Sequence, residues 1–150
     1  MKTIVILFVA LFSVCLPAYS GDNSLEKFIS NFDYEARNDM KIDSEALIQL
    51  IKEGRAQLID IRFPEEYAAW RIGFSKNIPL NELPDRLKEI DNSKVIVTAC
   101  PHLDRATIAM VYLRSRGIQA QYLKDGLIGL AENLRGDDAR LLINAIGKQK

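Results

Sequence analysis

From about residue 40 onward, short apolar runs alternate with stretches in which apolar residues recur at helical spacing. The runs that read as strands cover residues 41–42, 57–61, 76–78, 94–98 and 118–123. Such alternation is typical of a parallel sheet with helices packed on it. We therefore predict an α/β fold, a doubly wound, mostly parallel five-stranded sheet with helices on both faces.

Helix signals fill the intervals between these strands. Asp43 and Ser44 are candidate caps of the first helix, which Gly54 ends, and Pro64 suits the first position of the next. A further helix is predicted over about 82–90, and another between the loop after the fourth strand and Gly117. Two more are predicted after the fifth strand, one from about 126 to 134 and one from about 139 to 146. Asp137 is a candidate cap of the last one.

The segment before residue 40 carries one more helical pattern. Leu25, Phe28, Ile29 and Phe32 follow the i, i+3, i+4, i+7 spacing of a single helical face. We expect this face to pack on the core of the chain's own domain.

The first twenty residues have the features of a secretory signal peptide. Lys2 precedes an apolar run over 4–16, and small residues flank a cleavage point before Gly21. An uncleaved membrane anchor is the less favoured alternative, because a spanning helix needs about 20 apolar residues. We predict a signal peptide at 1–20, a helical extension at 21–39, one domain at 40–150, and a periplasmic or secreted protein.

Charge and cysteine content narrow the function. The 20 basic and 20 acidic side chains are interspersed, which gives no indication of a nucleic-acid partner. Cleavage would remove Cys15 and leave Cys100 as the only cysteine, so no internal disulfide could form. A buried, inert thiol is the simplest interpretation of Cys100.

The position of Cys100 favours a chemical role. It ends the fourth predicted strand and precedes a helix, and ligands of doubly wound sheets bind at such strand ends. The helix dipole and the charge of Arg105 are expected to favour the thiolate, which is the nucleophilic form.

The loop Cys100-Pro101-His102-Leu103-Asp104-Arg105 resembles that of the rhodanese-like family, which begins with cysteine and commonly ends with arginine five residues later. Residues 58–62, 64–67, 72–79 and 112–126 are similar to other family motifs in the same order. The resemblance covers about residues 40–134, so the predicted domain at 40–150 is a rhodanese-like domain with a C-terminal helix.

The resemblance implies a sulfurtransferase in which Cys100 is the catalytic residue. Cys100 would carry sulfane sulfur as a persulfide and pass it to a thiol or another nucleophile. The expected partners are a small sulfur donor and a thiol acceptor, which could be a protein thiol. No cofactor, no metal and no stable membrane insertion after signal cleavage are expected.

The other predicted site residues have supporting roles. Residues Pro101, His102, Leu103, Asp104 and Arg105 form the substrate loop, and Arg105 holds the loop's shape and adds positive potential. Asp60 and Arg62 are expected to brace the strand end beneath the loop. Trp70 is expected in core or rim packing, and its aromatic ring could instead line a groove.

Several loop residues depart from the family pattern. Pro101 lacks an N–H group, and Asp104 would repel a dianion, so we expect a persulfide or polysulfide donor rather than thiosulfate. His102 could exchange protons with an incoming thiol or simply be an exposed loop residue. Asp104 could also cap the following helix.

Two alternative functions stay open. One is a non-catalytic or redox-partner binding module of the same fold. The other, less favoured, is a cysteine-based phosphatase or arsenate reductase, whose loop has five residues between cysteine and arginine, where this chain has four.

Overall fold

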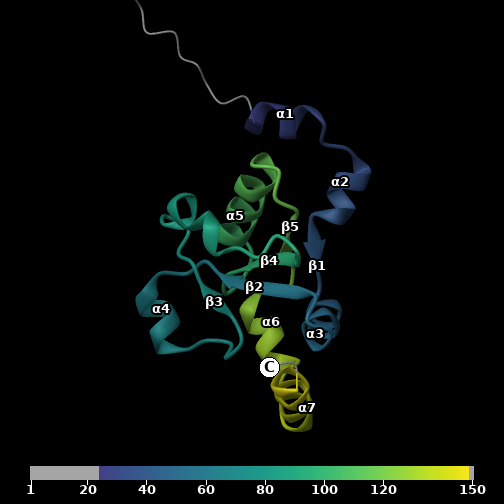
Figure 1. Cartoon of the computed structure of the whole chain (residues 1–150), viewed down its shortest axis with the longest axis vertical. Helices are drawn as coiled ribbons and strands as arrows, with labels where there is room; N and C mark the ends of the chain where they lie inside the picture. The colour runs from purple at the N-terminus through teal and green to yellow at the C-terminus, as the bar shows by residue number, and fades with distance from the viewer. Residues whose placement is uncertain (1–23, 149–150) are drawn as a thin grey trace, which may run out of the picture.

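A computed structural model describes residues 24–148, so the predicted signal peptide lies outside the described residues. Five strands form one parallel sheet in the order β1-β5-β4-β2-β3 (Figure 1). They are β1 (Lys41–Ile42), β2 (Ala56–Asp60), β3 (Lys76–Asn77), β4 (Val95–Ala99) and β5 (Ala120–Leu123). The predicted fold class is confirmed.

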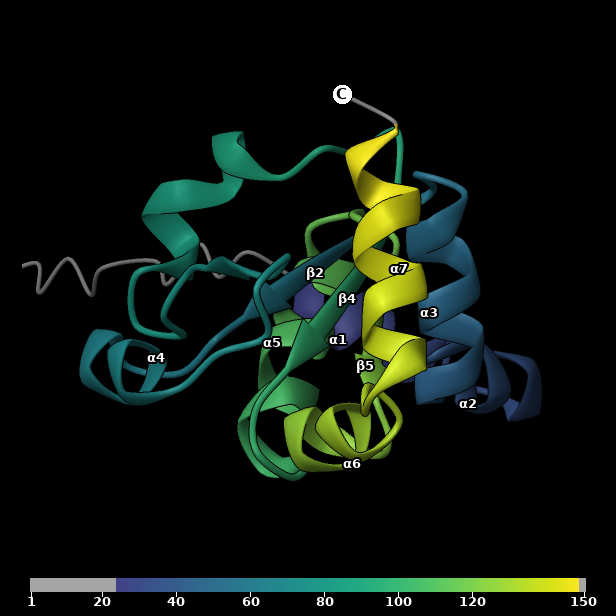
Figure 2. The ribbon, with the colours of Figure 1, turned by 90° about the horizontal axis from the view of Figure 1, so that it is seen from below.

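Helices surround this sheet, as the view in Figure 2 shows. They are α1 (Ser24–Ser30), α2 (Tyr34–Asp39), α3 (Ser44–Lys52), α4 (Pro64–Ala69), the 3-10 helix η1 (Leu83–Glu89), α5 (Asp104–Ser115), α6 (Gly126–Glu132) and α7 (Asp137–Gly147).

The sheet separates two hydrophobic cores. Side chains of α3, α6 and α7 pack on one face with Leu58 and Val97, whereas α5 and η1 pack on the other with Ile59 and Ile96. Because successive residues of β4 face opposite sides and both sides are covered, Ile96 and Val97 are each fully buried. This explains why the predicted central strand reads as an unbroken β-branched run.

The strand order creates a switch point between β2 and β4. From β2 the chain continues outward to β3, and from β4 it continues the other way to β5. Asp60 pairs with Ala99, so both strands end side by side, and the N–H of Ile61 donates to the carbonyl of Ala99 at 3.0 Å. The segments after these strands therefore meet where parallel sheets bind ligands.

The N-terminal helix differs from the prediction. α1 ends at Ser30 and buries no residue, while Leu25 and Ile29 are 47% and 58% exposed. Phe32 lies beyond the end of the helix and is 44% exposed, so the four residues do not share one continuous helical face. α1 contacts α5, but its predicted packing on the core is wrong.

Two other local predictions need correction. The segment predicted as a helix over 82–90 is a 3-10 helix, and its residue Arg86 has non-helical backbone angles, so that two short helical turns meet there at a kink. Gly136, at φ 54°, is the N-cap of α7, and Asp137 is its first residue rather than its cap. Asp43 caps α3 as predicted, accepting the N–H of Ala46 at 2.9 Å.

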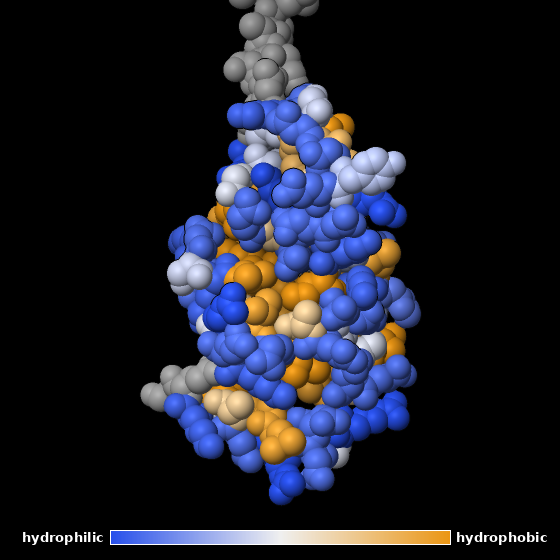
Figure 3. Space-filling view, turned by 90° about the vertical axis from the view of Figure 1, so that its right-hand side faces the viewer, coloured by the Kyte–Doolittle hydropathy of each residue, from blue (hydrophilic) through white to orange (hydrophobic). Residues whose placement is uncertain are grey.

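Figure 3 shows the side of the molecule that carries α2, β1 and α3, where orange apolar side chains lie between bands of hydrophilic ones. Within residues 24–148, none of the helices is long and apolar enough to cross a membrane.

Candidate active site

Cys100 lies at the switch point, directly after β4 and before α5. Its side chain is fully buried and packs within the core on the α5 side of the sheet. The N–H of Leu127 donates to the carbonyl of Cys100 at 2.8 Å, and the N–H of Ile128 donates to that of Pro101 at 3.4 Å. The first residues of α6 therefore fix the backbone of the Cys100 loop, residues 100–103, by hydrogen bonds to its carbonyls.

Gly126 allows this close approach. At φ 64° it adopts a left-handed conformation that favours glycine. A Cβ atom at this position would collide with the carbonyl oxygens of Pro101 and His102. The glycine turn that the sequence places after the last strand is thus a structural support of the loop.

The surroundings of Cys100 favour its protonated thiol. Burial raises its pKa above the ordinary value of 9.0, while hydrogen bonds from the N–H groups of Ala106 and His102 lower it and the carboxylate of Asp104 raises it further. Cys100 Sγ donates to Asp104 Oδ1 at 3.5 Å. The N–H groups at the start of α5 thus favour the thiolate, as predicted from the helix dipole, but burial opposes it more strongly and the pKa of Cys100 is raised.

Asp104 occupies the first turn of α5 rather than its cap. Leu103 is the N-cap residue and makes no side-chain capping bond, so the predicted capping role of Asp104 is wrong. The N–H of Arg105 and the Cys100 thiol donate to Asp104 and hold the pKa of its carboxyl below the usual value. A carboxylate thus lies beside the sulfur.

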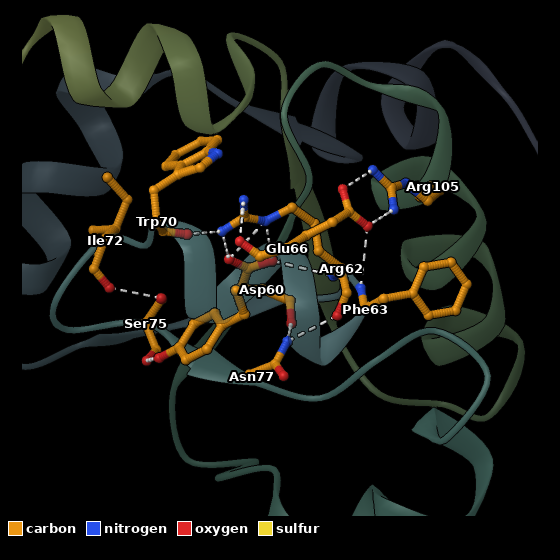
Figure 4. A network of polar contacts seen from close by, with 10 residues as sticks. Asp60, Arg62, Phe63, Glu66, Trp70, Ile72, Ser75, Asn77 and Arg105 are labelled. Atoms are coloured by element: carbon orange, nitrogen blue, oxygen red, sulfur yellow. Dashed lines mark hydrogen bonds and ion pairs between the residues drawn. The ribbon is translucent and has the colours of Figure 1, made fainter.

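Arg105 turns toward α4. Its Nη1 and Nη2 donate to the two carboxylate oxygens of Glu66 at 2.6 and 3.0 Å (Figure 4). The Arg105 hydrogen bond is also the main reason that the pKa of Glu66 is lowered. Glu66 therefore largely cancels the positive potential expected from Arg105, although the pair can fix the loop's shape.

The sequence reading did not single out Glu66 as a site residue. It lies 39 positions before Arg105, and no periodic pattern connects the two. The one sequence feature that could have pointed to Glu66 is its position in the segment after Pro64, which resembles a motif of the family.

Asp60 and Arg62 form a fully buried ion pair. Arg62 Nε donates to both Asp60 oxygens at 2.9 and 3.1 Å, and Nη2 donates to Oδ2 at 2.6 Å. The predicted bracing of the strand end is present, but the remaining bonds of Arg62 reach α4. Nη2 donates to the Trp70 carbonyl at 2.8 Å, and the guanidinium lies 4.1 Å from the centre of the Trp70 ring.

Further hydrogen bonds fix the segment after β2. Asn77 Nδ2 donates to the carbonyls of Asp60 and Arg62, each at 2.9 Å (Figure 4). Tyr67 Oη donates to the carbonyl of Ser75 at 2.8 Å. These bonds place α4, and with it Glu66, beside the start of α5.

The remaining predicted residues lie on the outer side of the site. Pro101 is half-buried, His102 is exposed, and Leu103 is 43% exposed. Trp70 is 41% exposed, so it lies at the rim rather than in the core, and Phe63 is 52% exposed. Among the described residues, no group of three or more His, Cys, Asp or Glu side chains is arranged to hold a metal ion.

Residues 43–133 match the family model of the rhodanese-like domain. The chain is 32% identical over 95 residues to a protein named Sulfurtransferase from Allochromatium vinosum, covering 62% of this chain and 89% of that relative. It is 31% identical over 78 residues to the thiosulfate sulfurtransferase GlpE of Pseudomonas fluorescens, covering 52% and 72% of the two chains.

Other relatives share only a part of their length. The HTH-type transcriptional regulator Rv0324 of Mycobacterium tuberculosis is 34% identical over 84 residues, which are 55% of this chain and 37% of the regulator. The matched part also spans 58% of the uncharacterized protein YqhL of Bacillus subtilis.

Solved structures share the fold. A rhodanese-related protein from Thermoplasma volcanium aligns with a TM-score of 0.56 and 27% identity, covering 62% of this chain and 91% of its own. A protein from Bacillus halodurans aligns with a TM-score of 0.59 and 26% identity, covering 72% and 80%. With the sheet order, the Cys100 loop and the matched residues in agreement, the chain belongs to the rhodanese-like domain family.

Proposed function

We propose that this protein is a sulfurtransferase that carries sulfane sulfur as a persulfide on Cys100. The observation that carries the proposal is the position of Cys100 at the switch point between β2 and β4, where N–H groups of His102 and Ala106 donate toward its sulfur. Relatives named as sulfurtransferases support the same class of reaction.

The reaction proceeds in two transfers. The Cys100 thiolate attacks the sulfane sulfur of the donor, so that a bond from Sγ to this sulfur forms while the donor's bond to it breaks, and the leaving group departs with the electron pair. An acceptor thiolate then attacks the outer sulfur of the persulfide, and the Cys100 thiolate leaves. The N–H groups around Sγ stabilise the anionic sulfur in both steps.

A non-catalytic or redox-partner binding module is the second candidate. The full burial of Cys100 and its raised pKa favour this alternative, because both suppress the nucleophilic form at rest. A phosphatase is less well supported, since the arginine that would bind the phosphate is already held by Glu66 and a carboxylate lies beside the sulfur.

Intact-mass analysis after incubation with a donor tests the proposal. We expect the protein to gain one sulfur atom from a polysulfide or a persulfide, to lose it on treatment with a reductant, and to transfer it to a thiol. Cys100→Ser is the control, because Cys15 is the only other cysteine in the chain. Absence of the adduct with every sulfane donor would leave the binding-module alternative, and turnover of a phosphate ester would favour the phosphatase.

We also propose that the protein is exported to the periplasm or secreted, where a small sulfur donor and a thiol acceptor, which includes a protein thiol, are its partners. The pattern over residues 1–20 supports export. N-terminal sequencing of the protein from cells is expected to begin at Gly21, and an N-terminus at Met1 or Lys2 would contradict export by a cleaved signal.

A further inference from the structure

We infer that Asp104 and Glu66 select the sulfur donor by its charge, so that the site accepts an alkyl persulfide and excludes thiosulfate. This inference rests on the proposed function and names its donor class. It assigns a role to Glu66, on α4, that the sequence pattern alone does not indicate.

The first contribution comes from the carboxylate nearest the sulfur. Asp104 Oδ1 lies 3.5 Å from Cys100 Sγ, so any donor that brings its sulfane sulfur to Sγ approaches this negative charge. Asp104 is exposed and is the first residue of α5. Its charge therefore acts on a donor that approaches Sγ from the solvent.

The second contribution is the neutralisation of the positive charge of Arg105. Arg105 is the loop residue that could attract an anion, but both of its terminal nitrogens donate to Glu66. Asp104, Arg105 and Glu66 together carry two negative charges and one positive charge. The nearby Arg62 does not alter this sum, because its charge is paired with Asp60 in the core.

The resulting negative potential acts unequally on possible donors. Thiosulfate carries two negative charges, one of them shared by oxygens that must lie close to the loop. An alkyl persulfide, R–S–SH, offers its terminal sulfur without such oxygens. At a separation of about 6 Å and an intermediate effective dielectric constant, one carboxylate changes the rate with a dianion by about tenfold or more.

The transfer from a persulfide is balanced without any further reactant. The Cys100 thiolate attacks the terminal sulfur of R–S–SH, the Sγ–S bond forms, and the S–S bond of the donor breaks. The electron pair leaves on R–S⁻, which takes up the proton released from the Cys100 thiol to become R–SH. Cys100 is oxidised to the persulfide and the donor is reduced to its thiol.

A donor series that differs in charge tests the inference. The probes are an alkyl persulfide, the monoanion methanethiosulfonate and the dianion thiosulfate. The measurement is the rate constant of Cys100 persulfide formation by mass analysis, and for the persulfide, which loses its proton near neutral pH, this constant is referred to the uncharged form R–S–SH. The variants are Asp104→Asn and Glu66→Gln. Glu65→Gln is the matched control, since Glu65 is an exposed neighbour on α4 and the Arg105 bonds go to Glu66 instead.

The relevant quantity is the rate with thiosulfate divided by the rate with the uncharged persulfide, because this ratio cancels changes in the reactivity of Cys100 itself. We expect each of Asp104→Asn and Glu66→Gln to raise the ratio about tenfold, methanethiosulfonate to respond about half as much on a logarithmic scale, and Glu65→Gln to change it less than about twofold. Added salt should raise the wild-type rate with thiosulfate and leave the uncharged donor unaffected.

A ratio that stays constant in both variants would overturn the inference, as would an equal rise in Glu65→Gln. These outcomes differ from failure of the proposed function, in which no donor forms a persulfide in any variant. If Glu66→Gln fails to fold, two measurements still test the inference. They are the ratio of the two rates in Asp104→Asn and the salt dependence of the wild-type rate with thiosulfate.

Discussion

At the residue scale, the main feature is a cysteine, Cys100, whose surroundings raise its pKa. Two N–H groups favour the Cys100 thiolate, but burial and the Asp104 carboxylate oppose it and prevail. The raised pKa of Cys100 makes the stability of the fold depend on pH. Because the folded pKa lies above the unfolded one, Cys100 stabilises the fold at pH values below 9.0, and this contribution is lost as the pH rises through the folded pKa.

Titration of the thiol checks this direction. The thiolate absorbance that the protein shows in excess of Cys100→Ser should appear with a midpoint above pH 9.0. Asp104→Asn should shift this midpoint to lower pH, since it removes a like charge at 3.5 Å. A midpoint below 9.0 in the wild type would show that the helix dipole outweighs burial.

A second prediction concerns the buried pair of Asp60 and Arg62. Asp60→Asn leaves the Arg62 charge without its partner in the core, so it should lower the free energy of unfolding by about 3–5 kcal/mol. The double variant Asp60→Asn, Arg62→Met removes both charges and should recover part of that loss. Denaturant unfolding measures both, and equal stabilities of the single variant and the wild type would contradict the prediction.

At the element scale, the Cys100 loop is supported by α6 from behind and by α4 from the side. The carbonyls of Cys100 and Pro101 accept N–H groups of α6, and Glu66 of α4 binds Arg105. The loop conformation therefore depends on contacts that are remote in sequence.

Substitution of Gly126 tests the support from α6. Gly126→Ala would place a Cβ against the carbonyls of Pro101 and His102, and we expect it to lower the free energy of unfolding by about 3 kcal/mol or more and to expose Cys100 to alkylation. Gly117→Ala is the matched control. Gly117 has a similar φ of 78°, but a Cβ there would meet no atom of residues 24–148 within 4 Å, so this change should cost about 1 kcal/mol and leave the reactivity of Cys100 unchanged. If both variants lose the same free energy of unfolding, the Cys100 loop can shift away from the added Cβ at position 126 at little cost.

The elements themselves could largely be predicted from the sequence. The central strand β4 is a β-branched and apolar run, and Asp43 and Pro64 mark helix starts where the structure has them. The helix predictions are wrong where a helix is interrupted, as at Arg86 in η1, or where it ends early, as at Ser30 in α1.

The candidate site could be predicted only in part. Cys100 was identified by its place between a strand and a helix, a local property. The pairing of Glu66 with Arg105 depends on how α4 packs beside α5, and the pKa direction of Cys100 depends on burial. Neither can be derived from residues adjacent in the sequence.

At the scale of the whole molecule, stability is concentrated in the two cores and not in the N-terminal helices. Leu47 and Leu113 are fully buried on opposite faces of the sheet, whereas Leu25 and Ile29 of α1 are largely exposed. Apolar surface that stays in water contributes little to the free energy of unfolding.

Substitutions at both places measure this difference. We expect Leu47→Ala and Leu113→Ala each to lower the free energy of unfolding by about 2–5 kcal/mol, from lost burial and the cavity left behind. Leu25→Ser and Ile29→Ser should stay within about 0.5 kcal/mol of the wild type. A large loss in the α1 variants would show that α1 is part of the cooperative unit.

The full burial of Cys100 also limits the rate at which any molecule can react with Sγ. No molecule can reach Sγ while its side chain is completely enclosed, so a structural opening must precede every reaction at the sulfur. The rate of modification by a small neutral alkylating agent should therefore level off as its concentration rises, and the plateau should equal the opening rate. The same plateau would limit the speed of oxidation, so that a burst of oxidant shorter than the opening time leaves most molecules with an intact thiol.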